Sequence, residues 1–463
     1  MGVTQTAPGT YRENQSTPPE WQRKHVLLLF ASLATIYIIL AVVRLVEYPL
    51  DGSQHFIYLA DGWLHGHLYL HDVPPDTQDY TLHNGHWYVA FPPLPAVLLL
   101  PIVAIFHLSH QAIISLLFSL GMGILNIWLM LGVLKRLARR HSLTFTAAAW
   151  LTVLFALGTN HLYATIQGNV WYTAHVVATT FLLLYIGETL DKRRPVLAGL
   201  YLGLSALSRS TILFTFPFFV LLAGGGEFFN RQGFVNDPGD HQGRHYILHD
   251  PPSTRNVVAT LVVARLTTLV VARRVLWKQL FLFFTVLALF IAGMLLYNQL
   301  RFGSLLDFGY NTMNVNSFVR GNLHTYGQFN WHFIRTNFRY MLLEPPIVVP
   351  YIPYLTFSPL GTGIFWTTPA LLLAFLAFRY RERRWLAASL LAACLLPIAL
   401  LLLYFNTGWY QFGYRFALDF LPFALLLVAL GMRARPGWWE KILIVLSVVI
   451  NIWGFVVLTF FHP

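Results

Sequence analysis

Apolar runs of about 20 residues recur along this chain, and they constrain its fold more than any other feature. The runs extend from Val26 to Phe461, and each is close to the length that an α-helix needs to cross a bilayer, about 20 residues. Only 11% of the 463 residues are charged, whereas soluble domains have roughly 25%. We therefore expect an all-α polytopic membrane protein with no large soluble domain between the runs.

The first run, residues 26–46, follows a polar tail and is not followed by a small-residue cleavage site. We interpret it as a retained anchor and not as a cleaved signal peptide. Residues 1–24 would then form a cytoplasmic tail, and residues 25–463 a single transmembrane domain. The net charge of +12 does not indicate nucleic-acid binding, because the basic residues occur in short clusters between apolar runs, where orientation in the membrane explains them.

The segment 88–108 decides the topology. It is long enough to span, but it contains Pro92, Pro93, Pro95 and Pro101, and proline breaks a helix interior. If the segment lies in the outer interface, about eleven spans follow and most of the 31 basic residues face the cytoplasm. If it crosses, most of them face outward, which the positive-inside rule rejects. We expect a multi-pass protein of the cell membrane with a cytoplasmic N-terminus.

This threading places two large loops, residues 47–110 and 299–355, on the outer side, where we expect any chemistry to occur. It leaves residues 224–278 as a cytoplasmic insertion. Turn-forming clusters rich in Gly and Pro open that insertion. The segment 255–277 that follows is interpreted as a basic helix lying on the inner membrane surface.

Many titratable side chains follow the first span, in EYPLDGSQHFIYLADGWLHGHLYLHDVPPD from Glu47. Polar and apolar residues separate at helical spacing from Asp51 onward, which predicts an amphipathic helix with its polar face, including His55, turned toward water. Asp51-Gly-Ser-Gln54 has the pattern of a capping box. Asp51 fits equally well as a carboxylate in a partly dry cleft that accepts a proton from a hydroxyl.

Five stretches of the chain carry a resemblance to a known family. They are Asp51 with HFIYLADGWLHGHLYL, then NGHWYVAFPPLPAVLLLPIVAIF, GLSALSRSTILFTFP (203–217), YNQLRFGSLLDFGY (297–310) and GWYQFGYRFALDFLPF (408–423). Together they resemble bacterial GT-C glycosyltransferases related to protein O-mannosyltransferases and aminoarabinose transferases. The resemblance implies a GT-C-like fold with two interfacial helices in the first outer loop, of which the PPLPA segment matches the second.

Enzymes of this family are understood to move a sugar from a polyprenyl-phosphate carrier to a hydroxyl of a lipid, glycan or protein on the outer face. An Asp in the first outer loop serves them as the base, and Asp51 is the matching position here. Arg209, Arg415 and Arg301, which the threading leaves outside, are the candidates for binding the donor phosphate. Each also fits a structural role, either as an anchor of a span end or as the partner of a nearby aspartate.

The substrate cleft is expected to be lined by polar and aromatic side chains of the outer loops and of the last motif. We expect His55, Tyr58, Asp61, Trp87, Tyr88, Tyr310, Trp409 and Tyr410 to contribute. Such aromatic residues suit stacking on a sugar ring, and they also suit the aromatic belt of an outer interface.

Many relatives have Asp-Glu where this chain has Asp51-Gly52, so a second acid is missing, which argues against a metal-assisted reaction. We expect no cofactor, although His67 and His71, the one pair at His-x3-His spacing, keep a divalent-metal hypothesis open. The alternative functions are a transporter or lipid flippase, or a non-catalytic relative. No inverted repeat and no central charged residues of the kind transport sites have are visible in the sequence.

Overall fold

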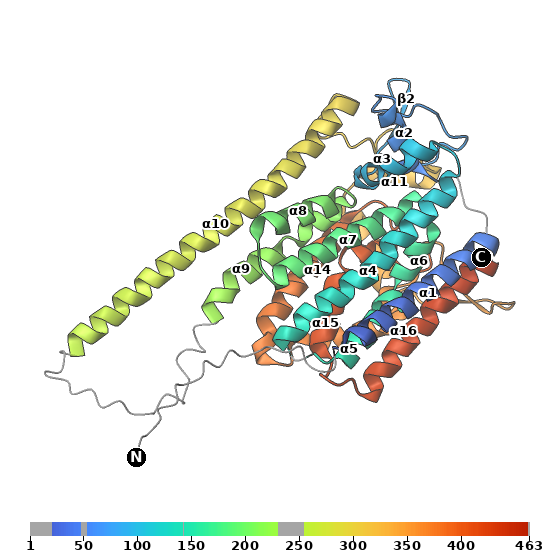
Figure 1. Cartoon of the computed structure of the whole chain (residues 1–463). Coiled ribbons are helices and arrows are strands. Elements are labelled where there is room, and N and C mark those ends of the chain that lie inside the picture. Colours follow the sequence, from blue (N-terminus) through green and yellow to red (C-terminus); the bar gives the residue numbers. More distant parts are fainter. Residues whose placement is uncertain (1–20, 48–52, 142, 230–253, 462–463) are drawn as a thin grey trace, which may run out of the picture.

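The computed structural model describes residues 21–47, 53–141, 143–229 and 254–461. In this part of the chain, six helices are long and apolar enough to cross a membrane. They are α1 (Arg23–Glu47), α4 (Gln111–His141), α7 (Val170–Leu190), α10 (Thr254–Phe302), α14 (Arg384–Leu403) and α16 (Trp438–Val456). Figure 1 shows them as a bundle. The expectation of an all-α polytopic membrane protein is confirmed.

Shorter helices occupy the remaining apolar runs. They are α5 (Phe145–Leu157), α6 (Asn160–Gln167), α8 (Pro195–Ala206), η1 (Ser210–Thr215), α9 (Pro217–Phe229), α13 (Ile364–Thr367), η4 (Pro369–Phe378) and α15 (Leu421–Gly431). The pair α5 and α6 is bent by 48° at its break. A helix as short as α15 rises only about 16 Å, roughly half of a hydrocarbon core. The count of eleven spans therefore stays a prediction.

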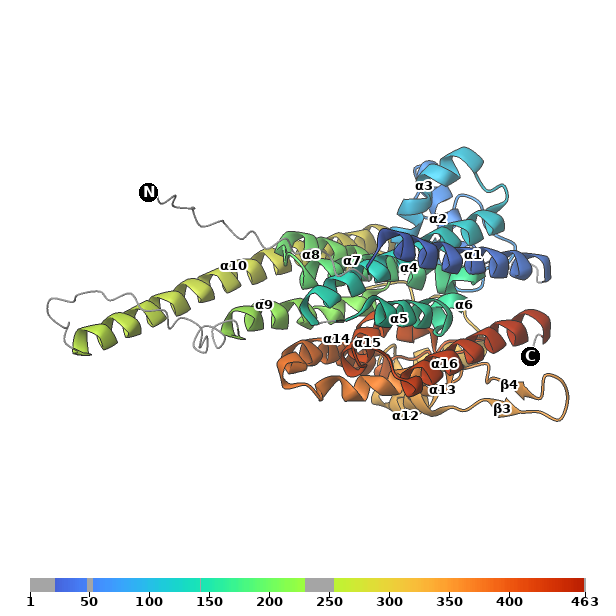
Figure 2. The same cartoon turned by 60° about the horizontal axis from the view of Figure 1, so that its bottom comes forward.

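The helix α7 lies at the centre of the bundle and packs against α4 and α8 (Figure 2). Nearly all of its side chains are buried, as expected for a helix that is apolar on every face. Small polar side chains join it to its neighbours. The hydroxyl of Thr180 donates to Asn126 of α4 at 2.6 Å, and that of Ser205 in α8 donates to the carbonyl of Ala178 at 2.7 Å.

The first outer loop contains two helices, as predicted. They are α2 (His55–Leu64) and α3 (Leu94–Phe106), which pack on each other at one end of the bundle. Pro93 precedes α3 as its N-cap residue, where a missing backbone donor costs little. With 13 residues, α3 is about 20 Å long and too short to span. This agrees with the topology that the positive-inside rule selected.

A β-hairpin between these helices was not predicted. Its strands, β1 (Tyr80–His83) and β2 (His86–Val89), pair in antiparallel register. Asn84 and Gly85 form the turn with φ values of 47° and 80°, which suits the twist of a two-residue hairpin. The Asn-Gly pair between two alternating runs is the sequence signal that identifies such a turn.

The second outer loop folds into short elements. They are α11 (Ser317–Tyr326), η2 (Trp331–Phe333), α12 (Ile334–Phe338), η3 (Arg339–Leu343), β3 (Ile347–Val348) and β4 (Leu355–Thr356). Later in the chain come η5 (Arg381–Arg383), η6 (Arg415–Asp419) and η7 (Val457–Phe461). The two outer loops are tied together by backbone bonds of 2.8 Å, from Asp79 to Asn314 and from Asn314 to Tyr80.

Two predictions about local structure were wrong, and the capping alternative is not supported. The N-cap of α2 is Gln54, whereas the capping-box pattern began at Asp51, which lies outside the described residues. Within α2, the predicted polar face does not point to water: His55, Tyr58 and Gly62 are all buried, and His65, just after the helix, is exposed. The segment 255–277 is not a separate surface helix but the first half of the 49-residue α10. No Gly or Pro interrupts that segment, so nothing breaks the helix before the span.

Candidate functional site

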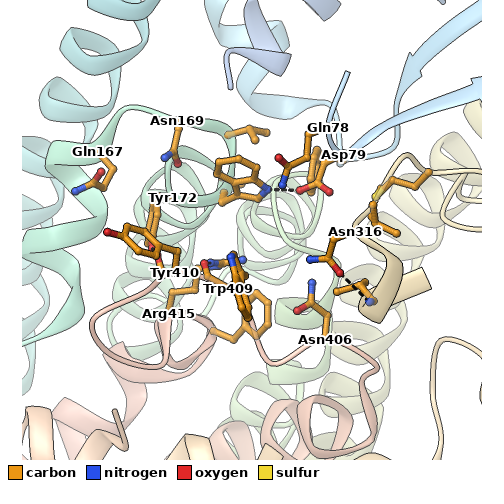
Figure 3. A pocket seen from close by; sticks show the side chains of 18 of the residues that line it. Gln78, Asp79, Gln167, Asn169, Tyr172, Asn316, Asn406, Trp409, Tyr410 and Arg415 are labelled. Carbon is orange, nitrogen blue, oxygen red and sulfur yellow. Dashed lines mark hydrogen bonds between the residues drawn. The ribbon is translucent and has the colours of Figure 1, made fainter. Parts of the chain in front are cut away.

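A cavity of about 310 Å³ opens at the end of the bundle where the outer loops lie. We call it the outer cavity. Figure 3 shows Asp79 and Gln78 on one side of it, and Arg415 with Tyr410 and Trp409 on another. Its lining comes from distant parts of the chain: Arg44, Gln78, Asp79, Phe91, Tyr163, Gln167, Asn169, Val170, Trp171, Tyr172, Ala174, Arg209, Tyr310, Met313, Val315, Asn316, Val319, Tyr404, Phe405, Asn406, Trp409, Tyr410, Arg415, Phe416 and Leu458.

Asp79 supplies the carboxylate of the outer cavity. It precedes β1 and has φ 62°, a left-handed conformation that Asp tolerates better than most residues. Its Oδ2 accepts a hydrogen bond of 2.7 Å from the indole Nε1 of Trp171 (Figure 3). Burial raises the pKa of Asp79, while the bond from Trp171 and the charge of Arg415 lower it in part. The result is a carboxyl group that holds its proton more tightly than an exposed one.

Arg209 lines the cavity from the residue before η1. Its Nε and Nη2 donate to the two carboxylate oxygens of Asp419 at 3.3 and 3.1 Å. Asp419 is completely buried and also accepts bonds from Nδ1 of His175, at 2.9 Å, and from the hydroxyl of Thr211. The structural alternative considered for Arg209, pairing with an aspartate, is therefore observed. The side chain is still 19% exposed, so the paired guanidinium faces the cavity.

Arg415 is the first residue of η6 and, unlike Arg209, forms no ion pair with a described carboxylate. Its Nη1 donates to the carbonyl of Trp409 at 3.1 Å, and its backbone amide donates to Gln411 at 3.2 Å. The guanidinium lies 5.4 Å from the ring centre of Tyr172 and 5.1 Å from that of Phe416. Within the described residues, its buried Nε has no hydrogen-bond partner. A buried donor of this kind costs free energy unless a ligand satisfies it.

Two lining residues were missed by the sequence reasoning, Arg44 and Asp79. Arg44 lies near the outer end of α1, is only 4% exposed, and directs Nη2 to Gln167 at 3.5 Å. A lone arginine at the end of an apolar run was the only signal for it. Asp79 sits in an aperiodic loop, and only its contact with Asn314 in the other outer loop brings it to the cavity.

The predicted site residues divide into two groups. Arg209, Arg415, Tyr310, Trp409 and Tyr410 all line the outer cavity. Arg301, His55, Tyr58, Asp61, Trp87 and Tyr88 do not line it. Asp51 lies outside the described residues.

Arg301 joins α10 to the hairpin and does not face the outer cavity. It donates to the carbonyl of Val89 at 2.7 Å and to Asn298 at 2.8 Å, and its guanidinium stacks 3.9 Å from the ring centre of Tyr297. Both terminal nitrogens of Arg301 are thus bonded, while its buried Nε has no partner among the described residues. These contacts fit the structural role that the sequence left open for it.

His55 packs inside the first outer loop. Its ring stacks on Tyr80 with centroids 3.8 Å apart, and Nε2 bonds the carbonyl of Gln78 at 3.0 Å. Burial lowers the pKa of His55 to about 4, so the ring is neutral at neutral pH. It positions Gln78, which lines the cavity, and does not itself reach the cavity.

The histidines of the first outer loop form a stack. The rings of His65 and His71 lie 3.9 Å apart, and that of His67 is 6.0 Å from His71. In the part of the chain that the structure describes, no group of three or more His, Cys, Asp or Glu side chains has a geometry that could hold a metal ion.

The outer cavity carries excess positive charge. Three guanidinium groups, of Arg44, Arg209 and Arg415, line it, and among the residues that the structure describes Asp79 adds the only carboxylate. Asp419, behind Arg209, offsets one of these charges. A ligand that bears negative charge and presents a sugar or another stacking ring matches this lining.

The chain was compared with known proteins. No protein-family model and no curated protein matches it. Similar solved structures include the apo form of an oligosaccharyltransferase of Archaeoglobus fulgidus, at 15% identity and a TM-score of 0.44. The archaeal oligosaccharyltransferase AglB of the same organism, in complex with an inhibitory peptide and a dolichol-phosphate, has the same values. These matches cover 96% of this chain and 56% of the archaeal chains. A function is therefore inferred from the residues of the cavity.

Proposed function

We propose that the chain is a membrane glycosyltransferase of the GT-C type, which moves a sugar from a polyprenyl-phosphate carrier to a hydroxyl acceptor on the outer face. The observation that carries the proposal is the outer cavity itself, because it brings a buried carboxylate and three arginines together. Transfer of a sugar from a phosphate needs a base for the acceptor and cations for the departing phosphate. The resemblance of the sequence motifs to this family agrees with that chemistry.

Arg415 and Arg209 are the proposed phosphate-binding residues. Both line the outer cavity, and their guanidinium groups lie 5.1 and 5.0 Å from the ring centre of Phe416, so a phosphate in the cavity has both cations nearby. The planar fork of arginine suits two phosphate oxygens. Because the surroundings hold both cations in place before the reaction, they stabilise the charge that develops on the departing phosphate.

Asp51 remains the base that the family resemblance implies, and Asp79 is a second candidate. Ser53, two residues after Asp51, accepts a bond of 3.0 Å from the amide of Val170, a residue of the cavity lining. Asp79 lines the cavity, and its raised pKa brings a carboxylate closer to the range in which general bases are effective at neutral pH. Trp409, which is 54% exposed, offers a face on which a sugar ring can stack.

The test is transfer of a labelled sugar from a polyprenyl-phosphate carrier by the purified full chain in detergent or nanodiscs. Asp51→Asn and Asp79→Asn are compared with Asp72→Asn, which changes an exposed carboxylate of the same loop that does not line the cavity. Loss of the base should lower the rate by about 10² to 10⁴-fold. The control should retain the wild-type rate.

The pH profile identifies the base. If Asp79 is the base, activity falls as the pH drops through its raised pKa, and Asp79→Asn removes this acidic limb along with most of the activity. If Asp51 is the base, Asp51→Asn has the large effect and Asp79→Asn a smaller one. Full activity in both variants contradicts the role of a carboxylate base. No transfer by the wild-type chain from any polyprenyl-phosphate donor contradicts the enzyme proposal.

Transport is not favoured by the described residues. The intramembrane polar side chains considered for a transport path include Asn126 and His175. Asn126 donates to the carbonyl of Val176 and accepts from Thr180, and His175 bonds Asp419. Both side chains thus join helices to each other, which is a packing role.

A further inference from the structure

A second cavity, of about 670 Å³, lies at the opposite end of the bundle. We call it the basic cavity. Val170, in the first turn of α7, lines the outer cavity, and Leu190, the last residue of α7, lines the basic cavity. These residues are about 30 Å apart along the helix, which equals the thickness of a hydrocarbon core. The two cavities therefore lie at the two faces of the membrane.

The charge of the basic cavity is strongly positive. Arg140, Arg193, Arg381 and Arg384 line it, and Glu382 is the only carboxylate among its described lining residues. These arginines belong to three clusters that are far apart in the sequence, at 135–140, 192–194 and 379–384. The positive-inside rule explains why each cluster is basic. It does not explain why all three converge on one hollow, where like charges repel each other unless an anion lies between them.

The hydrogen bonds of these arginines leave their charge available. Arg140 donates to the carbonyl of Asp191 at 3.2 Å, and Arg384 donates to the carbonyl of Phe378 at 3.2 Å. Both acceptors are neutral backbone groups. Arg193 has φ 52°, and its buried Nε has no partner among the described residues.

The rest of the wall is apolar. Leu190, Leu222, Phe378 and Leu386 line the cavity together with Trp385. The indole of Trp385 is fixed by a bond of 3.0 Å to the carbonyl of Leu221. Tryptophan beside arginine is typical of the headgroup level of a bilayer. A soluble anion would make no favourable contact with this apolar wall. An amphiphile, in contrast, can place its charged headgroup against the arginines and its acyl chains along the leucines.

We propose that the basic cavity binds the phosphate headgroup of an anionic phospholipid from the leaflet on the basic, cytoplasmic side of the membrane. Basic hollows between membrane helices are suited to such headgroups. The proposal does not rest on the transfer activity, since the site lies at the opposite membrane face from the outer cavity.

The test uses the full-length protein in nanodiscs of phosphatidylcholine, with and without phosphatidylglycerol. Retained phosphatidylglycerol is counted by native mass spectrometry, and thermal stability is measured in parallel. The double variant Arg140→Gln/Arg193→Gln removes two cavity arginines. Its matched control is Arg139→Gln/Lys192→Gln, which removes the same charge from the neighbouring residues, both exposed and outside the cavity lining. Melting in pure phosphatidylcholine verifies that each variant is folded.

Wild type and the control double variant should retain phosphatidylglycerol and be stabilised by it. The cavity variant should bind it about fivefold more weakly for each arginine removed. Equal retention by the cavity and control variants would overturn the proposal. Inorganic phosphate is the third arm: if it alone stabilises the wild type in phosphatidylcholine and phosphatidylglycerol adds nothing, the site takes a soluble anion and the lipid assignment is wrong.

Discussion

The buried pair of Arg209 and Asp419 should be coupled in stability, and a double-mutant cycle measures the coupling. Asp419 has no exposed surface and accepts bonds of 3.3 and 3.1 Å from Arg209. Removing one partner of a buried pair costs about 3–5 kcal/mol, because the other charge stays buried without compensation. For Asp419→Asn we expect the lower end, about 3 kcal/mol, since the remaining Arg209 reaches the cavity and can be partly solvated there.

Arg209→Gln should cost more, about 4 kcal/mol, because the carboxylate left behind is completely buried. Only His175 and Thr211 then bond it among the described residues. In the double variant neither charge remains. Its loss of stability should therefore be about 2 kcal/mol smaller than the sum of the single losses.

Equilibrium unfolding in mixed micelles, followed by tryptophan fluorescence, gives the free energies of unfolding. Arg209→Gln combined with Asp307→Asn is the control. Asp307 bonds the amide of Gly309 and forms no ion pair with Arg209 among the described residues. The control losses should add within about 0.5 kcal/mol. If the losses of Arg209→Gln and Asp419→Asn also add within that margin, the pair is not coupled and the reasoning is refuted.

Three further outcomes follow from single positions. The pKa of His55 is about 4 in the folded chain and about 6.5 in an unfolded one. The free energy of unfolding should therefore fall as the pH drops through this window, by at most about 1.4 kcal/mol per pH unit. In thermal melts, His55→Phe should flatten this pH dependence, and an unchanged slope would contradict the prediction. Gly168→Ala should lower the free energy of unfolding by roughly 2–4 kcal/mol, because φ is 69° and a Cβ would lie 2.6 Å from the Cα of Leu116. In the control variant Gly121→Ala, the new Cβ meets nothing within 4 Å, so this change should be neutral or stabilising. Equal melting temperatures of the two variants would refute the prediction. Arg301→Gln should lower the melting temperature but leave the donor KM of the folded enzyme unchanged, and a raised KM would give it a role in binding.

The sequence predicted the helices and the non-spanning Pro-rich segment because both depend on local rules. An apolar run of sufficient length becomes a span, and the prolines of residues 88–108 oppose one. The meeting of Arg209 and Arg415 at one cavity was also anticipated, but through the motif resemblance, because the two residues are far apart in the chain. Trp409 and Tyr410 followed from the same motif.

The errors concern contacts between distant segments. Helical spacing predicted one buried and one wet face for α2, but residues 55–62 are all buried, because spacing does not tell what packs on each face. Tyr80 of β1 stacks on His55, and β2 and α3 also contact α2. Asp79 could not be found from its neighbours in the sequence. Its position depends on pairing with Asn314, in the other outer loop. The hairpin was predictable from Asn84-Gly85, and the reasoning simply passed over that signal.

The arginines of the outer loops and of η6 differ in whether they line the outer cavity, and this difference distinguishes the proposed binding residues from structural ones. The positive-inside rule makes such residues scarce outside, so each one needs a reason. Arg339 pairs with Glu344, and Arg301 is committed to a backbone carbonyl and an amide. Arg301 and Arg415 each have a buried Nε without a partner in the described structure, but of these two only Arg415 lines the outer cavity. Arg209 also lines it, and its paired side chain is partly exposed. Both line one cavity with Asp79, a carboxylate of raised pKa, so the anion binding that we propose would account for two arginines on a side where the positive-inside rule disfavours them.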